Sequence, residues 1–171
     1  MNYVLEYEIC RQTIFYFIEE YLEICLREHQ MNDMNHIINM DHSDHYEIIT
    51  NRGDGTTTTI MIAALWAVLF NKNINVAFCG KSYSIFRYNL DIINELFDKF
   101  QESLPEDQRF ITLEQRTLST FTFSNNSKIY FIQDVENGLR GRNFEYIFVD
   151  NYEIPKNHAF MYNRVVTVRS S

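Results

Sequence analysis

The feature that most constrains the fold of this chain is an alternation of β-rich and helical segments in its first two thirds. Five segments follow one another: a β-rich run, a glycine-bearing turn, a mostly apolar helix pattern, a buried strand pattern and an amphipathic helix pattern. They span 46–50, 51–55, 56–71, 73–80 and 82–104. Strands that alternate with helices in this way predict a parallel sheet with right-handed crossover connections.

The rest of the chain adds further strand patterns. Residues 119–132 alternate on both sides of three polar residues at 125–127, which is typical of a hairpin. An apolar strand at 144–150 ends in Asp150, and a last strand lies near 164–170. The sequence therefore predicts one α/β domain with a central, mainly parallel sheet at 46–171, preceded by a helical segment at 1–45.

The helical segment is expected to hold one long amphipathic helix at 3–28, where apolar residues recur at helical spacing, and a shorter helix at 30–40. Asp and His residues in the DHSDH stretch at 41–45 are of metal-ligand type, but a solvated turn is the favoured interpretation. Farther along, Trp66 is expected in the core and Tyr88 in helix packing.

Composition excludes several classes of protein. The net charge is −8, and residues 1–50 carry all of it with ten acidic and two basic side chains. A protein that coats nucleic acid through a global positive field is therefore not expected. The 3 cysteines have no CxxC spacing, so neither a disulfide framework nor a zinc site is indicated. No run reaches the roughly 18 apolar residues of a membrane span.

The turn at 51–55 is a candidate phosphate site. Gly53 and Gly55 stand between a buried strand and a helix, so backbone N–H groups and the helix N-terminus point to one place. The hydroxyl of Thr56 or Thr57 could bind the Mg²⁺ of a nucleotide. An ordinary turn capped by threonine explains the loop alone equally well.

Charge at this turn departs from that of the usual phosphate loop. The lysine that normally follows the last glycine is replaced by Thr56. Arg52 is the only nearby cation, and Asp54 adds an opposing negative charge.

A second candidate is the acid that ends the 144–150 strand. Asp150 would lie at the carboxyl edge of a parallel sheet, where ligands of α/β proteins bind, and a carboxylate there can hold Mg²⁺. A neighbouring acid could orient an attacking water. The adjacent Asn151 cannot act as a base, and the nearest following carboxylate belongs to Glu153.

Five segments follow one another along the chain: LREHQMNDMNHII, YEIITNRGDGTTTT, INVAFCG, FTFSNNSKIYFI and GLRGRNFEYIFVD. In this order, they resemble the ATPase half of the large terminase subunit of tailed phages. The resemblance covers roughly residues 20–171. It implies a P-loop NTPase-like, RecA/ASCE-type three-layer fold with ATP and Mg²⁺ as cofactors. It also implies a motor that drives double-stranded DNA into a procapsid.

Partners and location follow from the same resemblance. A ring of like subunits, the portal and the small terminase subunit are implied, in the cytoplasm of the infected host cell and transiently at the procapsid, with no membrane role. A nuclease part would follow the ATPase half in this family.

The resemblance implies roles for individual residues. Gln30 corresponds to a glutamine that contacts adenine, Arg52 to the loop arginine, Thr57 to the Mg²⁺-binding hydroxyl and Asp150 to the Mg²⁺-binding aspartate. The candidate nucleotide-binding set is Gln30, Arg52, Gly53, Asp54, Gly55, Thr56 and Thr57. The candidate catalytic set is Arg52, Asp150 and Glu153.

Two positions depart from the family pattern. Thr56 replaces the phosphate-binding lysine and Asn151 replaces the catalytic glutamate, so ATP hydrolysis is expected to be weak or lost. The alternatives are a catalytically inactive terminase-like assembly protein and a fragment of a helicase-like ATPase. Arg140 and Arg142 form a small basic loop that could touch DNA, sense phosphate or simply be solvated.

Overall fold

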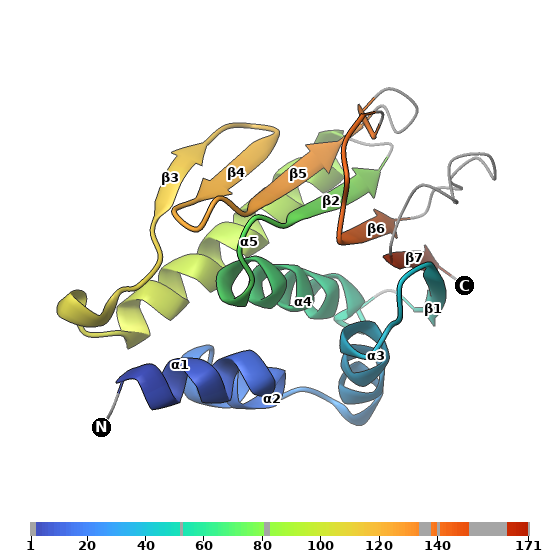
Figure 1. The fold of residues 1–171 in the computed structure, drawn as a ribbon. Coiled ribbons are helices and arrows are strands. Elements are labelled where there is room, and N and C mark those ends of the chain that lie inside the picture. The colour runs from blue at the N-terminus through green and yellow to red at the C-terminus, as the bar shows by residue number, and fades with distance from the viewer. Residues whose placement is uncertain are drawn as a thin grey trace.

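The computed structural model describes residues 3–51, 53–80, 83–133, 138–139, 141–150 and 164–170 (Figure 1). Its described strands form one sheet in the order β1-β7-β6-β2-β5-β4-β3. Their bounds are β1 (Asp44–Thr50), β2 (Asn75–Gly80), β3 (Leu113–Arg116), β4 (Thr120–Phe123), β5 (Lys128–Ile132), β6 (Tyr146–Asp150) and β7 (Arg164–Ser170).

Five neighbouring strands, from β1 to β5 in the sheet order, run parallel. The predicted parallel sheet is therefore confirmed. The hairpin at 119–132 is also confirmed, since β4 and β5 pair antiparallel across a turn in which Asn126 has φ +65°. The sequence pattern missed β3, a short and mostly exposed strand that pairs antiparallel with β4.

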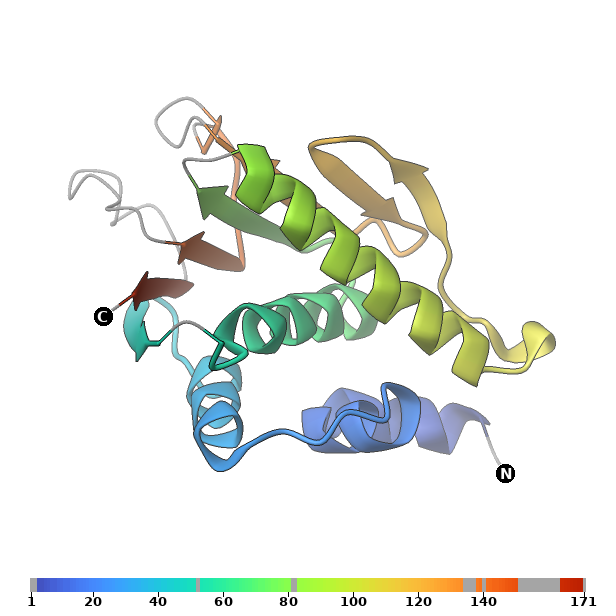
Figure 2. The ribbon, with the colours of Figure 1, turned by 180° about the vertical axis from the view of Figure 1, so that it is seen from behind.

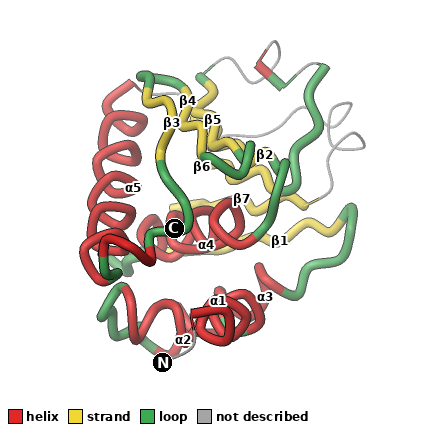
Figure 3. Tube along the Cα trace, turned by 60° about the vertical axis from the view of Figure 1, so that its left-hand side comes forward, coloured by secondary structure: helices red, strands yellow, loops and turns green. Residues whose placement is uncertain are grey.

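Two helices cover one face of the sheet, as Figure 2 shows from behind. They are α4 (Thr56–Phe70) and α5 (Tyr83–Ser103), which match the predicted helices within one residue at each end. A second helical layer lies beyond α4 and holds α1 (Tyr3–Gln12), α2 (Ile14–Tyr16), the π-helical turn η1 (Phe17–Tyr21) and α3 (Glu28–Ile38). Sheet, α4 with α5, and the N-terminal helices thus form three layers, visible in Figure 3. A short 3₁₀ turn, η2 (Glu106–Gln108), follows α5.

The expectation of one helix over 3–28 is wrong. Thr13 has extended backbone (φ −135°, ψ 97°), and Glu23 has φ +47° after the π-helical turn. The interruption places Phe17 in the core, where its ring centroid lies 5.5 Å from that of Phe70 and 5.4 Å from that of Phe100. Burial against α4 and α5 outweighs the continuity of a helix whose local sequence carries neither glycine nor proline.

Side chains alternate between two cores on the two faces of the sheet. Phe78 and Phe148 pack on the α4 face with their ring centroids 5.1 Å apart. Cys79 and Val149 join Leu139 in a smaller cluster on the opposite face. This alternation decides which side chains at the strand ends point toward α4.

Trp66 ties the N-terminal layer to the core. Its Nε1 donates a hydrogen bond of 2.7 Å to the carbonyl oxygen of Cys10, and its ring packs beside the buried cluster. Trp66 therefore packs against the core as expected, although its side chain is only half-buried. Tyr88 on α5 is 59% exposed, so its expected packing role is wrong.

Candidate functional site

The loop after β1 turns the chain directly into α4. Thr50 ends the strand, and Thr56 begins a helix of 15 residues. Gly53 has φ +93° and Gly55 has φ +78°, values at which a side chain is strained. Gly55 is the N-cap and has no side chain with which to cap the helix. The positive end of the α4 dipole therefore faces this loop.

Gln30 of α3 packs against the last glycine of the loop. Its side chain is only 7% exposed, and its Nε2 donates to the carbonyl oxygen of Gly55 at 3.2 Å and to the hydroxyl of Thr59 at 3.1 Å. Its Oε1 accepts from the backbone N–H of Arg27 at 3.0 Å. These contacts hold the N-terminal layer to the start of α4. The adenine contact implied for Gln30 stays a prediction.

Space as well as φ requires glycine at position 55. A Cβ there would lie 2.7 Å from Nε2 of Gln30, closer than nonbonded atoms approach. At Gly53 nothing lies within 4 Å of the same added atom. Glycine is therefore favoured at position 53 by its φ alone, and at position 55 by both its φ and the closeness of the Gln30 side chain.

The two threonine hydroxyls at the ends of the loop lie within hydrogen-bond distance of each other. Oγ1 of Thr56 lies 2.7 Å from Oγ1 of Thr50, and Thr56 is 5% exposed. The residue at the position of the usual lysine thus points back to β1. Thr57, the next residue, is half-buried in the first turn of α4.

Asp54 is held by the start of its own loop. Its Oδ2 accepts from the backbone N–H of Asn51 at 2.7 Å and from the Thr50 hydroxyl at 3.3 Å. The Asn51 N–H holds the pKa of the Asp54 carboxyl below its usual range, with smaller contributions from Thr50 and from nearby His29. His29 also contacts the backbone oxygen of Asp54 through Nε2 at 3.0 Å.

Asp150 ends β6 at the same edge of the sheet as the loop. In the register it lies level with Val168 of β7, which lies level with Ile48 of β1. Two strand spacings of about 4.8 Å therefore separate β6 from β1. Because Asp150 follows Phe148 by two positions, it points toward the α4 face, from which the loop also leaves. The structure thus brings Asp150 and the loop to one corner.

Four of the residues singled out in the sequence lie outside the described residues: Arg52, Arg140, Asn151 and Glu153. Arg142 is described, and its guanidinium lies 4.7 Å from the centroid of the Tyr130 ring. Sequence reasoning missed Thr50, His29 and Thr59 as neighbours of the loop. For Thr59 the signal was present, since it follows Gly55 by one helical turn.

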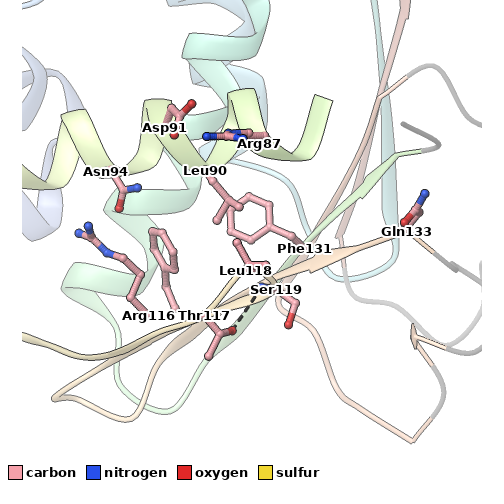
Figure 4. Close-up of a pocket in the computed structure, with 11 residues that line it drawn as sticks. Arg87, Leu90, Asp91, Asn94, Arg116, Thr117, Leu118, Ser119, Phe131 and Gln133 are labelled. Atoms are coloured by element: carbon pink, nitrogen blue, oxygen red, sulfur yellow. Dashed lines mark hydrogen bonds between the residues drawn. The ribbon is translucent and has the colours of Figure 1, made fainter. Parts of the chain in front are cut away.

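A large pocket lies elsewhere, between α5 and the strands β4 and β5 (Figure 4). Its volume is about 750 Å³, and Leu90 points toward the Phe131 ring across it. Arg87, Asp91 and Arg116 supply the charged groups of its wall. None of the residues proposed for the nucleotide lines it.

Two further properties concern only the described part of the chain. The described residues hold no group of three or more His, Cys, Asp or Glu side chains arranged to bind a metal. In the stretch at 41–45, a turn at residues 42–43 leads into Asp44 and His45, which begin β1. The described part also contains no helix that is both long and apolar enough to cross a membrane.

A family model described as the N-terminal part of the T4likevirus-type terminase large subunit matches residues 48–165. The chain belongs to this family. The match begins within β1 and spans the loop, α4, α5 and the strand that carries Asp150. The comparison with curated proteins finds no match for this chain.

Solved terminase structures share the fold. The large terminase ATPase domain of Thermus phage P74-26 superposes with a TM-score of 0.59 at 10% identity, covering 90% of this chain and 68% of that one. The HK97 bacteriophage large terminase gives 0.64 at 8% identity, over 85% and 33%. The large terminase of the thermophilic bacteriophage D6E in complex with ADP gives 0.56 at 14% identity, over 84% and 39%.

The similarity to these solved structures identifies the fold of this chain. The terminase chain described here has the P-loop NTPase-like fold of those ATPase domains, with a mainly parallel sheet and flanking helices. It spans 33% of the HK97 chain and 39% of the D6E chain.

Proposed function

We propose that this chain is the ATPase part of a viral DNA-packaging motor and binds ATP with Mg²⁺ between the 51–57 loop and Asp150. The observation that carries the proposal is the position of Asp150, which lies on the α4 face two strands from β1, at the edge where the loop leaves the sheet. Membership in the terminase family and the ADP complex of the D6E terminase support it.

The residues of this corner fit a magnesium nucleotide. The loop turns at Gly53 and Gly55 into the positive end of a helix that carries no side-chain cap, which suits phosphate. The Thr57 hydroxyl and the Asp150 carboxylate are oxygen ligands of the kind that Mg²⁺ prefers. Bound there, Mg²⁺ would neutralise charge on the phosphates.

Hydrolysis is proposed to be weak or lost. Thr56 supplies no cation to the phosphates, and its hydroxyl is already 2.7 Å from that of Thr50. Asn151 stands where the family carries the water-orienting glutamate, which leaves Glu153 as the candidate acid nearby. Arg52 is the candidate replacement for the missing lysine.

Calorimetric titration of the full chain with ATP and Mg²⁺ tests the site. We expect saturable binding that Asp150→Ala weakens and Thr56→Lys strengthens, because these variants remove a metal ligand and add a phosphate-binding cation. Asp98→Ala, on the exposed side of α5, serves as a control for lost negative charge. Failure of all variants to bind ATP would contradict the proposal.

A second candidate is an assembly component without turnover. The contact between the Thr50 and Thr56 hydroxyls favours this candidate, because the side chain at the position of the usual lysine already has a partner within the protein. Phosphate release measured with and without double-stranded DNA separates the two. DNA-stimulated release identifies a motor, whereas the assembly role predicts neither ATP binding nor phosphate release.

Partners and location are part of the same proposal. The chain works with double-stranded DNA, the portal and the small terminase subunit as a ring, in the infected host cell at the procapsid. Family membership supports these assignments. Sedimentation with and without ATP tests ring formation.

A further inference from the structure

The loop after β1 carries its own anion. The Asp54 carboxylate accepts hydrogen bonds from the Asn51 N–H at 2.7 Å and from the Thr50 hydroxyl at 3.3 Å. Both donors belong to the segment that leads into the proposed phosphate site. A side-chain carboxylate therefore occupies donors of the kind that a phosphate group would use.

The hydrogen bonds extend to the position of the missing lysine. Thr50 Oγ1 lies 2.7 Å from Thr56 Oγ1 as well as 3.3 Å from Asp54 Oδ2. A hydroxyl has one hydrogen, so when Thr50 donates to Asp54, Thr56 donates to Thr50. The three side chains then form one chain of hydrogen bonds that ends on the carboxylate.

We propose that Asp54 acts as an internal competitor of phosphate in this loop and sets the nucleotide affinity of the chain low. The inference rests on the proposed function, because it concerns the same loop. Asp54 repels an incoming phosphate by its charge and withholds the Asn51 and Thr50 donors. Nucleotide binding thus requires this carboxylate to release its donors or to tolerate a second anion beside it.

The electrostatic part of the effect has an expected size. Two unit charges about 4 Å apart in water repel enough to lower an affinity about fivefold. Salt screens such a repulsion, so the effect of Asp54 should shrink as ionic strength rises. These two properties distinguish a charge effect from a change in loop shape.

Asp54→Asn is the informative variant. Its amide oxygen can still accept from the Asn51 N–H, so the loop keeps its shape while the charge is lost. Asp44→Asn is a matched control at the other end of β1. There Oδ2 of Asp44 accepts from the backbone N–H of Asp41 at 2.7 Å, with the same spacing of three residues.

The test is a calorimetric titration of ATP with Mg²⁺ into the wild-type chain, Asp54→Asn and Asp44→Asn, at about 0.05 M and about 0.5 M salt. We expect Asp54→Asn to bind about fivefold tighter than wild type at low salt, with a smaller difference at high salt. Asp44→Asn should bind like wild type. ATP binding by Asp54→Asn where wild type shows none would also support the inference.

The contrary outcomes are distinct. If wild type binds ATP and Asp54→Asn binds no tighter, or Asp44→Asn tightens equally, the role of Asp54 is wrong and the proposed site stands. If no protein binds ATP, both are wrong. Circular dichroism checks that Asp54→Asn is folded. If Asp54→Asn does not fold, Asp54→Ser, which also lacks the charge, takes its place in the same titration.

Discussion

The hydroxyl of Thr56 at the start of α4 meets that of Thr50 at the end of β1, with 2.7 Å between the two oxygens. This contact links the two ends of the loop that is proposed to bind phosphate. It joins a strand and a helix through Thr56, the residue at which the resemblance to terminases implies a phosphate-binding lysine.

Thr56→Val removes this contact without changing the shape of the side chain. We expect the free energy of unfolding to fall by about 1 kcal/mol, since a buried hydroxyl pair is lost and Thr50 loses a partner. Urea denaturation measures the change. Thr58→Val, in the same turn and half-buried, is the control and should change stability less. Equal stability of Thr56→Val and wild type would show that the contact contributes nothing.

Gly55→Ala should destabilise the protein more than Gly53→Ala. Both glycines have positive φ, which costs about 1–2 kcal/mol for other residues. Only at position 55 does the added Cβ meet Gln30, at 2.7 Å from its Nε2. Thermal denaturation compares the two. The double variant Gly55→Ala with Gln30→Ala should lose less stability than the sum of its single changes, because the clash is relieved.

Phe17→Ala should cost about 3–5 kcal/mol of unfolding free energy. The Phe17 side chain is fully buried and contacts the rings of Phe70 and Phe100. If residues 1–45 and the rest unfold as one unit, Trp66 fluorescence and circular dichroism will give coincident transitions. Phe15→Ala, at a half-buried position, should cost less. Two separate transitions would show that the N-terminal layer unfolds on its own.

Alkaline stability should depend on Tyr46. Burial, together with the hydrogen bond from its hydroxyl to Asp33 at 2.8 Å, raises the pKa of Tyr46 to about 12. The folded state then holds a proton that the unfolded chain releases near pH 10, so the contribution is complete below pH 10 and is lost as pH rises toward 12.

Urea denaturation between pH 9 and about 12 measures this loss. Tyr46→Phe should be less stable than wild type near neutral pH and should lose less stability across the alkaline range. Tyr88→Phe is the control, because Tyr88 is 59% exposed and should leave the pH profile unchanged. Identical alkaline profiles for Tyr46→Phe and wild type would contradict the assignment.

Most of the elements could be predicted because their periodicities are strong and local. The α5 pattern places Leu90, Ile93 and Phe97 on one buried face. The start of α4 is fixed by Gly55, whose positive φ ends the loop. Patterns of this kind need only the side chains within a few turns.

What could not be predicted depends on distant partners. The break at Thr13 carries no glycine or proline signal and exists because Phe17 packs against Phe70 and Phe100, each more than fifty positions away in the chain. The contact between Gln30 and Gly55 joins residues 25 positions apart. The closed pair of Thr50 and Thr56 also required the structure, since spacing alone does not show which way a hydroxyl points.

The position of β7 in the sheet determines when the sheet can form during synthesis of the chain. β7 is the last described strand in the chain, yet it lies between β1 and β6. The first strand emerges from the ribosome with no neighbour in the sheet and must wait for Arg164–Ser170 before it pairs. A nascent chain stopped before this strand would leave the loop and Asp150 on two unconnected pieces of sheet. The corner proposed to hold a nucleotide therefore forms only once β7 has been added.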